Sequence, residues 1–528
     1  MTPFLQFRLW TRRGPVAERV LTAVVGTVVL ALLVWVAVPS GTATGTSDAQ
    51  SVGTTGGAAP GTGPAAGGGA DTGASTKPGA APGGSTTSTP AAAGGTGAGV
   101  STVAPSGPGA AATGTATQQS NPCTNLRSTD QGVSATTINI DVVLFQLAGA
   151  ASNSFIGVPE PADQQADFDA IFNSINKAGG IQCRQIAAKY YTGNFLDASQ
   201  QHATCLSIVQ DKPFAVLDNV ALDSTQEARE CVAQNKIPLF DTGAILGSET
   251  RGNLYPYMFS TADQFDIGIR NSIFGAQKIG WFKDLNKVGI LADDCFPEVN
   301  AQVIQNLNEI GITQKQIVTY VFGGCPTIPP PQEVEQAVLS FRGAGVTHVT
   351  DLSQVPKSGY FSKAAQAQSY HPKYNVTGGA PSVFDGSSGS SAGPDATNFD
   401  GAISITELSY GEQNTPGLAH SPATATCNKI MAGAGLQPVE KQGAFYAGAA
   451  CNVVWMFQMA ADRASPLLRT NLVNGLAKVG PWLQSFPGGS SVFNRVGQMS
   501  AGQSWRADVY DGSCPCFRIP DTTWRPSL

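Results

Sequence analysis

Residues 176–191 read NKAGGIQCRQIAAKYY, and they join a predicted helix to a predicted strand. The residues before the joint, 162–178, place apolar side chains at helical spacing, and two consecutive glycines then end the helix. Residues 185–191 contain β-branched and aromatic side chains, which favour a strand. A helix that leads directly into a strand is typical of a parallel α/β sheet. Cys183 lies at this joint, so its role depends on the compartment in which the chain folds.

The same alternation of strands and helices extends along the chain. Strands are predicted at residues 138–145, 185–191, 213–217 and 237–240, and helices at 162–178, 197–211 and 224–234. A second series predicts strands at 287–292, 316–321, 347–351, 374–378 and 401–408, and helices at 264–280, 298–310 and 333–343. A long helix at 445–464 and a strand at 504–510 follow. The sequence therefore predicts an α/β protein of two similar lobes, with parallel sheets that helices cover on both faces.

The first 38 residues have the charge pattern of a membrane signal-anchor. Residues 1–19 carry four arginines, and residues 20–38 form the uncharged run VLTAVVGTVVLALLVWVAV. At about 1.5 Å per residue, this run is just long enough for a bilayer core of roughly 30 Å. The positive-inside rule then predicts a cytoplasmic N-terminus, a single-pass transmembrane helix and a folded region outside the cytoplasm. The alternative is a cleaved signal peptide, although no A-x-A cleavage site follows the run.

Residues 39–120 consist almost entirely of glycine, alanine, threonine, serine and proline. Such a segment buries too little apolar surface to offset the entropy of ordering it, so we expect a disordered linker. The formal net charge of −6 argues against a nucleic-acid partner. All ten cysteines follow the linker, which predicts disulfides in an exported region. The four histidines are scattered, so no metal site is expected.

Four short stretches carry a resemblance to a known family. They are GVSATTINI at 132–140, NKAGGI at 176–181, DSTQ at 223–226 and IPLF at 237–240. In this order and spacing they resemble the type I periplasmic solute-binding proteins of ABC importers for branched-chain amino acids, the leucine-binding kind. The resemblance implies two Rossmann-like lobes with a central ligand cleft. It assigns residues 121–262 plus 412–500 to lobe one and residues 263–411 plus 501–528 to lobe two.

The resemblance also implies a pairing of the cysteines. The implied bridges are Cys205–Cys231, Cys295–Cys325, Cys427–Cys451 and Cys123–Cys183. The last bridge would join the end of the linker to the folded domain at the joint within residues 176–191. Cys514 and Cys516 can pair with each other in a tight loop. The sequence alone leaves this connectivity open.

Ligands of open parallel sheets bind beyond the carboxyl ends of the strands. The segments that follow the predicted strands contain the candidate residues Gln146, Phe155, Asp293, Phe296 and Gln354. The family resemblance adds positions that differ from the amino-acid-binding members. These are Leu222 at an expected serine, Ile245 at an expected threonine and Ala380 at an expected acid. The backbone amides of Gly243 and Ala244 are expected to be available to a ligand.

The departures from the family pattern predict a ligand that is less polar than a standard amino acid, or cationic. Asp223, next to Leu222, would also oppose a carboxylate at the mouth of the site. Simpler interpretations stay open. Asp223 can be a helix N-cap, Asp293 can be a solvated loop residue, and Phe155 and Phe296 can belong to the core or the rim.

The sequence contains no catalytic constellation. Residues 389–393 match the G-x-S-x-G pattern of hydrolases, but no apolar strand runs into this turn. Neither a Walker A sequence nor a dinucleotide-binding glycine motif is present, so we expect neither an enzyme nor a cofactor. We expect a solute-binding protein that delivers an amino-acid-like or less polar molecule to the permease of an ABC importer. The alternative is a membrane-tethered sensor that acts through a membrane partner, because no cysteine for a lipid anchor follows the apolar run.

Overall fold

The computed structural model describes most of the chain beyond the linker. The described residues are 123–124, 126–147, 149–155, 157–195, 197–222, 226–243, 254–294, 297–323, 329–352, 357–385, 393–442, 446–502 and 504–528. They all belong to one compact unit, residues 112–528. Among them, no helix is both long and apolar enough to cross a membrane. The predicted anchor at 20–38 and the predicted linker at 39–120 lie outside the described residues.

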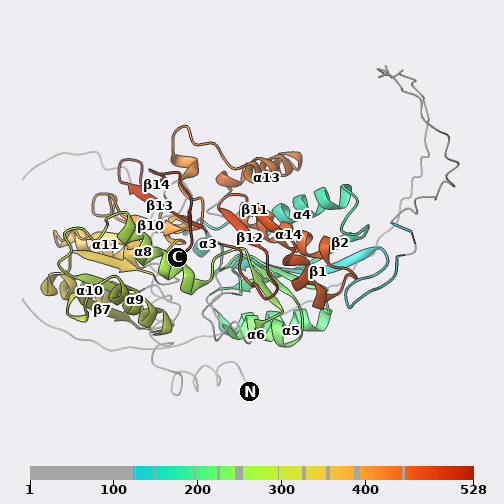
Figure 1. Cartoon of the computed structure of the whole chain (residues 1–528), viewed down its shortest axis with the longest axis horizontal. Helices are drawn as coiled ribbons and strands as arrows, with labels where there is room; N and C mark the ends of the chain where they lie inside the picture. Colours follow the sequence, from blue (N-terminus) through green and yellow to red (C-terminus); the bar gives the residue numbers. More distant parts are fainter. Residues whose placement is uncertain are drawn as a thin grey trace, which may run out of the picture. The chain divides into compact units, whose positions relative to one another are not determined.

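The first sheet is parallel throughout and has the strand order β2-β1-β3-β4-β5 (Figure 1). Its strands are β1 (Thr137–Gln146), β2 (Gln185–Asn194), β3 (Ala215–Asp218), β4 (Leu239–Asp241) and β5 (Met258–Ser260). β1 lies inside the sheet, and its side chains alternate between two separate hydrophobic cores. Val142 and Leu144 enter one core, whereas Val143 and Phe145 enter the other.

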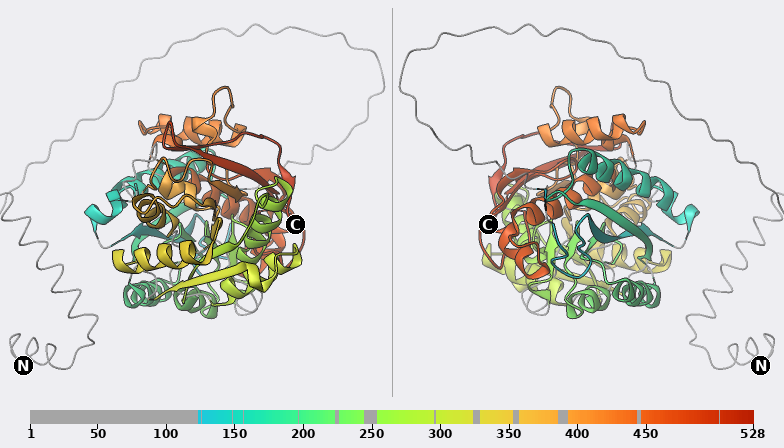
Figure 2. Two further views of the ribbon diagram at one scale, coloured as in Figure 1. Left: turned by 90° about the vertical axis from the view of Figure 1, so that its left-hand side faces the viewer. Right: turned by 90° about the vertical axis from the view of Figure 1, so that its right-hand side faces the viewer.

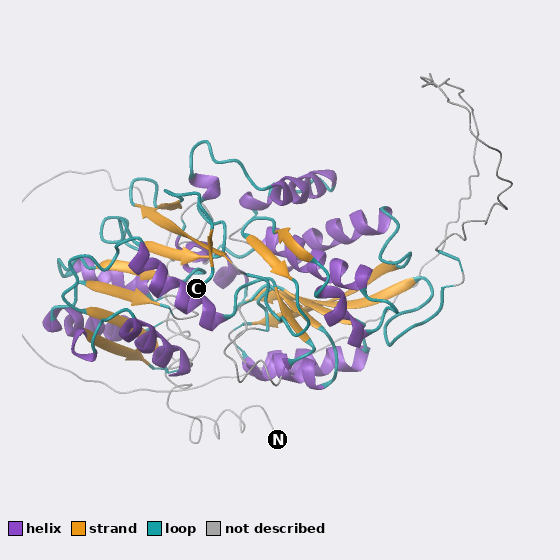
Figure 3. Cartoon of the chain, in the orientation of Figure 1, coloured by secondary structure: helices purple, strands orange, loops and turns teal. Residues whose placement is uncertain are grey.

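Helices cover both faces of the first sheet (Figure 3). On one face lie α4 (Pro161–Lys177), α13 (Pro422–Gly433) and α14 (Tyr446–Arg463). On the other face lie α5 (Ala198–Asp211) and α6 (Gln226–Gln234). The predicted apolar stripe of α4 is buried, including Phe168 and Ile171. Asp197 is the N-cap of α5: its side chain accepts a hydrogen bond from the Gln200 N–H at 3.0 Å.

The second sheet has eight strands and is mixed. Its strands are β6 (Val288–Asp293), β7 (Ile317–Phe322), β8 (His348–Asp351), β9 (Lys373–Val376), β10 (Ile403–Thr406), β13 (Ser504–Asp511), β14 (Cys516–Arg518) and β15 (Arg525–Pro526). The strands from β7 to β10 are parallel, and β13, β14 and β15 add antiparallel pairs. The order β7-β6-β8-β9 repeats the order β2-β1-β3-β4 of the first sheet. The sequence prediction of two similar α/β units is therefore correct at the level of strand order.

Helices also cover both faces of the second sheet. They are α8 (Phe265–Lys278) and α9 (Pro297–Glu309) on one face, with α10 (Pro331–Ala344) and α11 (Ser358–Ala367) on the other. The remaining α-helices are α3 (Ala150–Phe155), α12 (Ala380–Phe384) and α15 (Leu472–Leu476). Short 3₁₀ helices are η1 (Gln314–Gln316), η3 (Glu412–Asn414), η4 (Val439–Lys441) and η5 (Arg469–Asn471). A separate hairpin joins β11 (Gly480–Leu483) to β12 (Ser490–Phe493).

The chain passes between the elements of the two sheets three times. The first crossing, residues 261–264, follows β5; the second, 407–421, follows β10; and the third, 494–503, precedes β13. The first and third crossings lie side by side, because a Cβ at Gly502 would lie 2.0 Å from the Oδ1 atom of Asp263. C-terminal elements therefore pack in both halves of the fold, as the side views show for the red segments (Figure 2).

Four disulfides lie within the described residues. They are Cys123–Cys183, Cys205–Cys231, Cys427–Cys451 and Cys514–Cys516. The first three are pairs that the family resemblance implied. Cys183 thus fixes the lead segment to the joint between α4 and β2, where the Arg184 guanidinium also donates to the carbonyl oxygens of Arg127 and Ser134. The predicted bridge Cys295–Cys325 lies outside the described residues.

We expect Gly448→Ala to destabilise the fold, because a Cβ at this position of α14 would lie 1.5 Å from the Phe486 carbonyl oxygen. Such overpacking typically costs about 1–3 kcal/mol. Gly268→Ala is the matched control: it lies within α8 with nothing inside 4 Å of its Cβ, so alanine should stabilise the helix by up to about 1 kcal/mol. Urea unfolding of the 112–528 unit measures both changes, and equal effects would contradict the close packing of α14.

Candidate functional site

The carboxyl ends of the parallel strands form the candidate site in each sheet. In the first sheet, β1, β3 and β4 end at Gln146, Asp218 and Asp241. In the second sheet, β6 and β8 end at Asp293 and Asp351. Ligands of open α/β sheets bind at this edge, so the contacts of these terminal residues determine what a ligand can meet.

The carboxylate of Asp218 holds the loop that follows β3. It accepts hydrogen bonds from the backbone N–H groups of Ala221 at 3.0 Å and Leu222 at 3.1 Å. Its side chain has no exposed surface. Asp218 therefore orders the loop backbone and does not offer a carboxylate to solvent.

Asp351 repeats this arrangement at the equivalent position of the second sheet. Its carboxylate accepts hydrogen bonds from the N–H groups of Lys357 and Ser358, both at 2.6 Å, and so caps α11. Asp241, at the end of β4, accepts from the Gly243 N–H at 2.9 Å and lies 3.7 Å from the Arg229 guanidinium. In both sheets, the acids at the strand ends thus accept hydrogen bonds from backbone N–H groups in the loop that follows the strand.

A polar network joins three elements at the edge of the first sheet. The Asn219 side chain donates to the carbonyl oxygen of Tyr446 at 3.2 Å, and its own carbonyl oxygen accepts from the Thr242 hydroxyl at 2.7 Å. These residues follow β3, begin α14 and follow β4, respectively. The network fixes the relative positions of the two loops and the helix at this edge.

Aromatic side chains lie beside this network. The ring of Phe145, next to the end of β1, lies 5.5 Å from the ring of Phe195 and 5.4 Å from the ring of Tyr446, centroid to centroid. Gln146 follows Phe145 and is half-buried. The first-sheet edge therefore combines an apolar wall with a few fixed polar groups, which is the usual composition of a small-molecule site.

The edge of the second sheet carries a buried cation. Lys357 is only 3% exposed, and its ammonium lies 5.9 Å above the ring of Phe322, the last residue of β7. The Lys357 backbone N–H donates to the Asp351 carboxylate at 2.6 Å, so the lysine is held at the edge of the second sheet.

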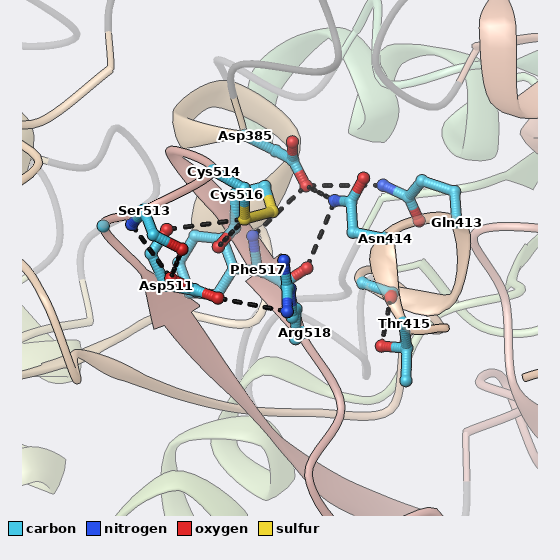
Figure 4. The surroundings of a disulfide bond; sticks show 12 residues. Asp385, Gln413, Asn414, Thr415, Asp511, Ser513, Cys514, Cys516, Phe517 and Arg518 are labelled. Atoms are coloured by element: carbon cyan, nitrogen blue, oxygen red, sulfur yellow. Dashed lines mark hydrogen bonds and ion pairs between the residues drawn. A yellow bond between two sulfur atoms is a disulfide. The ribbon is translucent and has the colours of Figure 1, made fainter. Parts of the chain in front are cut away.

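Asp385, at the end of α12, is held inside the second half of the fold (Figure 4). Its carboxylate accepts hydrogen bonds from the Asn414 side chain at 2.6 Å and from the Phe517 N–H at 3.4 Å. Phe517 directly follows the Cys514–Cys516 bridge, which closes the turn between β13 and β14. Asp385 thus links α12 to the second crossing and to β14, and it is buried.

For three of the predicted site residues, the observed contacts differ from those expected of a ligand-binding residue. Leu222 and Ala380 are completely buried in hydrophobic cores, so neither presents a side chain at the surface. The prediction that the Gly243 amide is available is wrong, because that N–H donates to Asp241. Gln146 stays a candidate at the edge of the first sheet.

The other predicted site residues cannot be placed by their side chains. Asp223, Ala244, Ile245, Phe296 and Gln354 lie outside the described residues. Phe155 lies in α3 and Asp293 ends β6, and the structure describes the backbone of these two residues only. The candidate residues that the sequence analysis missed are Asn219, Thr242 and Tyr446. The first two directly follow buried strands, a signal that the sequence contained.

Solved structures with the same architecture were found by structural comparison. A solute-binding protein of an ABC transporter from R. palustris, in complex with 4-hydroxybenzoate, matches with a TM-score of 0.56 at 13% identity, over 74% of this chain and 97% of that chain. A fatty acid ABC transporter substrate-binding protein from Thermomonospora curvata matches with a TM-score of 0.55 at 12% identity, over 76% and 95%. The isoleucine complex of a branched-chain amino acid transporter substrate-binding protein from Streptococcus pneumoniae gives 0.53 at 15%, over 74% and 100%.

These matches, together with the repeated strand order, decide the architecture. The chain has the type I periplasmic-binding fold. No protein-family model and no curated protein sequence matches the chain. At these identities the likeness concerns the fold, and the ligand has to be inferred from the chain's own residues.

We expect Asp218→Ala and Asp351→Ala each to lower the free energy of unfolding by about 1–3 kcal/mol, because each leaves two backbone N–H groups without their acceptor. Glu335→Ala removes an exposed carboxylate from α10 and should change stability by less than about 0.5 kcal/mol. Chemical denaturation of the 112–528 unit measures all three. Near-neutral effects at both aspartates would mean that these acids do not hold the loops.

Proposed function

We propose that this protein is an extracytoplasmic solute-binding protein that captures a small molecule between two lobes and delivers it to an ABC importer. The observation that carries the proposal is the pair of α/β sheets with the same strand order, joined by three crossings, in a fold shared with solved substrate-binding proteins. The described residues hold no cluster of His, Cys, Asp and Glu that could bind a metal ion.

The proposed lobes follow the crossings of the chain. Lobe one comprises residues 121–262 plus 412–500, and lobe two comprises residues 263–411 plus 501–528. The proposed mechanism is a hinge closure that brings the carboxyl edges of the two sheets together over the ligand. In this proposal, Gln146 and the Asn219 network contribute from lobe one, and the segment that ends at Lys357 contributes from lobe two.

The proposed ligand is a mainly apolar molecule with a carboxylate or similar group. The half-buried ring of Phe195, which lies beside Phe145, supplies apolar surface at the edge of the first sheet. Solved structures with this fold hold ligands of this range, including 4-hydroxybenzoate and isoleucine. A cationic solute is the other option from the sequence.

We also propose that the chain is anchored in the cell membrane by residues 20–38, with residues 1–19 in the cytoplasm and residues 39–120 as a flexible tether. The apolar run and the preceding arginines support this topology. The disulfides between 123 and 516 are consistent with folding in an oxidising compartment.

A membrane-tethered sensor with the same fold is the second candidate. The observation in its favour is that the first cysteine of the chain is Cys123, so the lipid-bearing cysteine that usually follows the signal of importer binding proteins is missing here. A sensor of this kind would act through a membrane partner. Both candidates share the same ligand-binding step.

Thermal melting of the oxidised 112–528 unit against a ligand panel tests the binding step. We expect aromatic and aliphatic carboxylates to raise the melting temperature, because a ligand at 100-fold over its Kd adds about 2.7 kcal/mol to the free energy of unfolding. A shift with polyamines alone would reverse the proposed ligand charge. No shift with amino acids, aromatic acids, fatty acids, amides or polyamines would contradict solute binding.

A further inference from the structure

The turn between β13 and β14 contains the bridge Cys514–Cys516, which spans a single residue (Figure 4). The cysteines of the other three described bridges lie 60, 26 and 24 residues apart in the sequence and join separate segments. A disulfide stabilises a fold mainly by restricting the unfolded chain, and this effect grows with the length of the loop that it closes. Cys514–Cys516 therefore stabilises the fold less in this way than the other bridges, and its presence needs another explanation.

Hydrogen bonds and an ion pair also hold this turn. The carboxylate of Asp511 accepts from the Ser513 N–H at 2.9 Å and lies 3.2 Å from the Arg518 guanidinium. The Gly512 N–H donates to the carboxylate of Asp400 at 2.9 Å. None of these contacts involves a sulfur atom, so the turn can persist when the bridge is open.

The two cysteines of the bridge differ in their exposure to solvent. Cys514 is half-buried and lies between two exposed residues, Ser513 and Pro515. Cys516 is the first residue of β14 and is only 4% exposed. Thiol–disulfide exchange requires that a thiolate reach a sulfur atom of the bridge. An external thiol therefore reaches Cys514 more readily than Cys516.

The residues directly after the bridge hold the second crossing. The carbonyl oxygen of Phe517 accepts a hydrogen bond from the Asn414 side chain at 3.2 Å. The Ile519 N–H donates to the hydroxyl oxygen of Thr415 at 2.9 Å. A Cβ at Gly411 would lie 3.1 Å from the Phe517 carbonyl oxygen, so the two backbones are in close contact. A change in the position of β14 therefore acts on this crossing.

We propose that Cys514–Cys516 is a thiol-exchange site for dithiols outside the cytoplasm, and that opening it loosens β14 against the second crossing. One thiolate of the dithiol attacks the Sγ atom of Cys514, a new S–S bond forms, and Cys516 leaves as a thiolate. The second thiolate of the dithiol then attacks its own sulfur in the mixed disulfide and releases Cys514. The dithiol is oxidised to a disulfide and the bridge is reduced by two electrons. The two protons that the dithiol loses pass through water to the two cysteines.

The other bridges supply comparisons within the same chain. Cys427 and Cys451 are completely buried, so their bridge should resist a reductant while the protein stays folded. Cys123 is exposed, but its bridge attaches the lead segment to Cys183 at the joint between α4 and β2. Opening that bridge would release the lead segment and not β14. The effect on the second crossing is therefore specific to Cys514–Cys516.

Graded reduction of the oxidised, full-length protein in detergent tests the exchange site. Dithiothreitol serves as the dithiol, N-ethylmaleimide labels the thiols that appear, and mass spectrometry locates the labels. We expect Cys514 and Cys516 to be labelled at a reductant concentration at least about tenfold below the one that opens Cys427–Cys451. Opening of both bridges at the same concentration would overturn the proposal.

Hydrogen exchange of the backbone amides, measured in the same samples, tests the effect on the crossing. Exchange should rise in residues 411–415 and 516–519 once the bridge is open, and unchanged exchange there would overturn this part of the proposal. The double variant Cys514→Ser/Cys516→Ser should show the raised exchange without reductant and no further rise with it. Since reductant still opens Cys123–Cys183 in this variant, a remaining response of the crossing would assign the effect to that bridge.

Two single variants test which sulfur is attacked. Cys514→Ser leaves the thiol of Cys516, and Cys516→Ser leaves the thiol of Cys514. We expect an aromatic disulfide reagent to react at least about tenfold faster with the Cys516→Ser variant, because its remaining thiol is the more exposed one. Equal or reversed rates would contradict attack at Cys514. Because no solute is added in any of these measurements, their outcome does not depend on solute binding.

Discussion

The burial of β1 on both faces is the constraint on which the rest of the structure depends. A strand whose alternate side chains enter two different cores needs helices on both sides of its sheet. Val142 packs towards α4 and α14, whereas Val143 packs towards α5. With both faces covered, only the edges of the strands can approach a ligand, and the carboxyl edge is where the connecting loops diverge. The position of the site is thus a consequence of the core.

The order of the elements could be predicted wherever a strand or helix was long enough for its apolar residues to show a regular spacing. The apolar stripe of α4 and the run in β1 are such cases, and both lie within one or two residues of their predicted bounds. β5, with the three residues MFS, and β14 and β15 were not predicted, because two or three residues give no period. β13 pairs antiparallel with β10, and β14 and β15 pair antiparallel with β13, so the second sheet is mixed where the sequence suggested a parallel one.

The candidate site was less predictable, for a physical reason. Sequence places Asp218, Asp241 and Asp351 at the ends of buried strands, but it does not say whether a carboxylate faces a ligand or its own loop. In the structure these acids accept backbone N–H groups within seven residues of themselves. Because the Gly243 N–H donates to Asp241, it is not available to a ligand, and Leu222 lies in a hydrophobic core. Three of the four described disulfides were implied by the family resemblance, whereas the sequence alone left their connectivity open.

Under the proposed function, recognition comes from groups that the strand-terminal acids position rather than from the acids themselves. Asp351 caps α11 through Lys357 N–H, and in doing so it fixes the backbone from which the Lys357 ammonium reaches Phe322. Asp218 orders the turn that begins with Asn219, whose amide joins Thr242 to Tyr446. An acid at a strand end thus determines where a neighbouring cation or amide lies. Because the third strands of both sheets use this device at equivalent positions, the loops at the two edges are held in place by the chain itself.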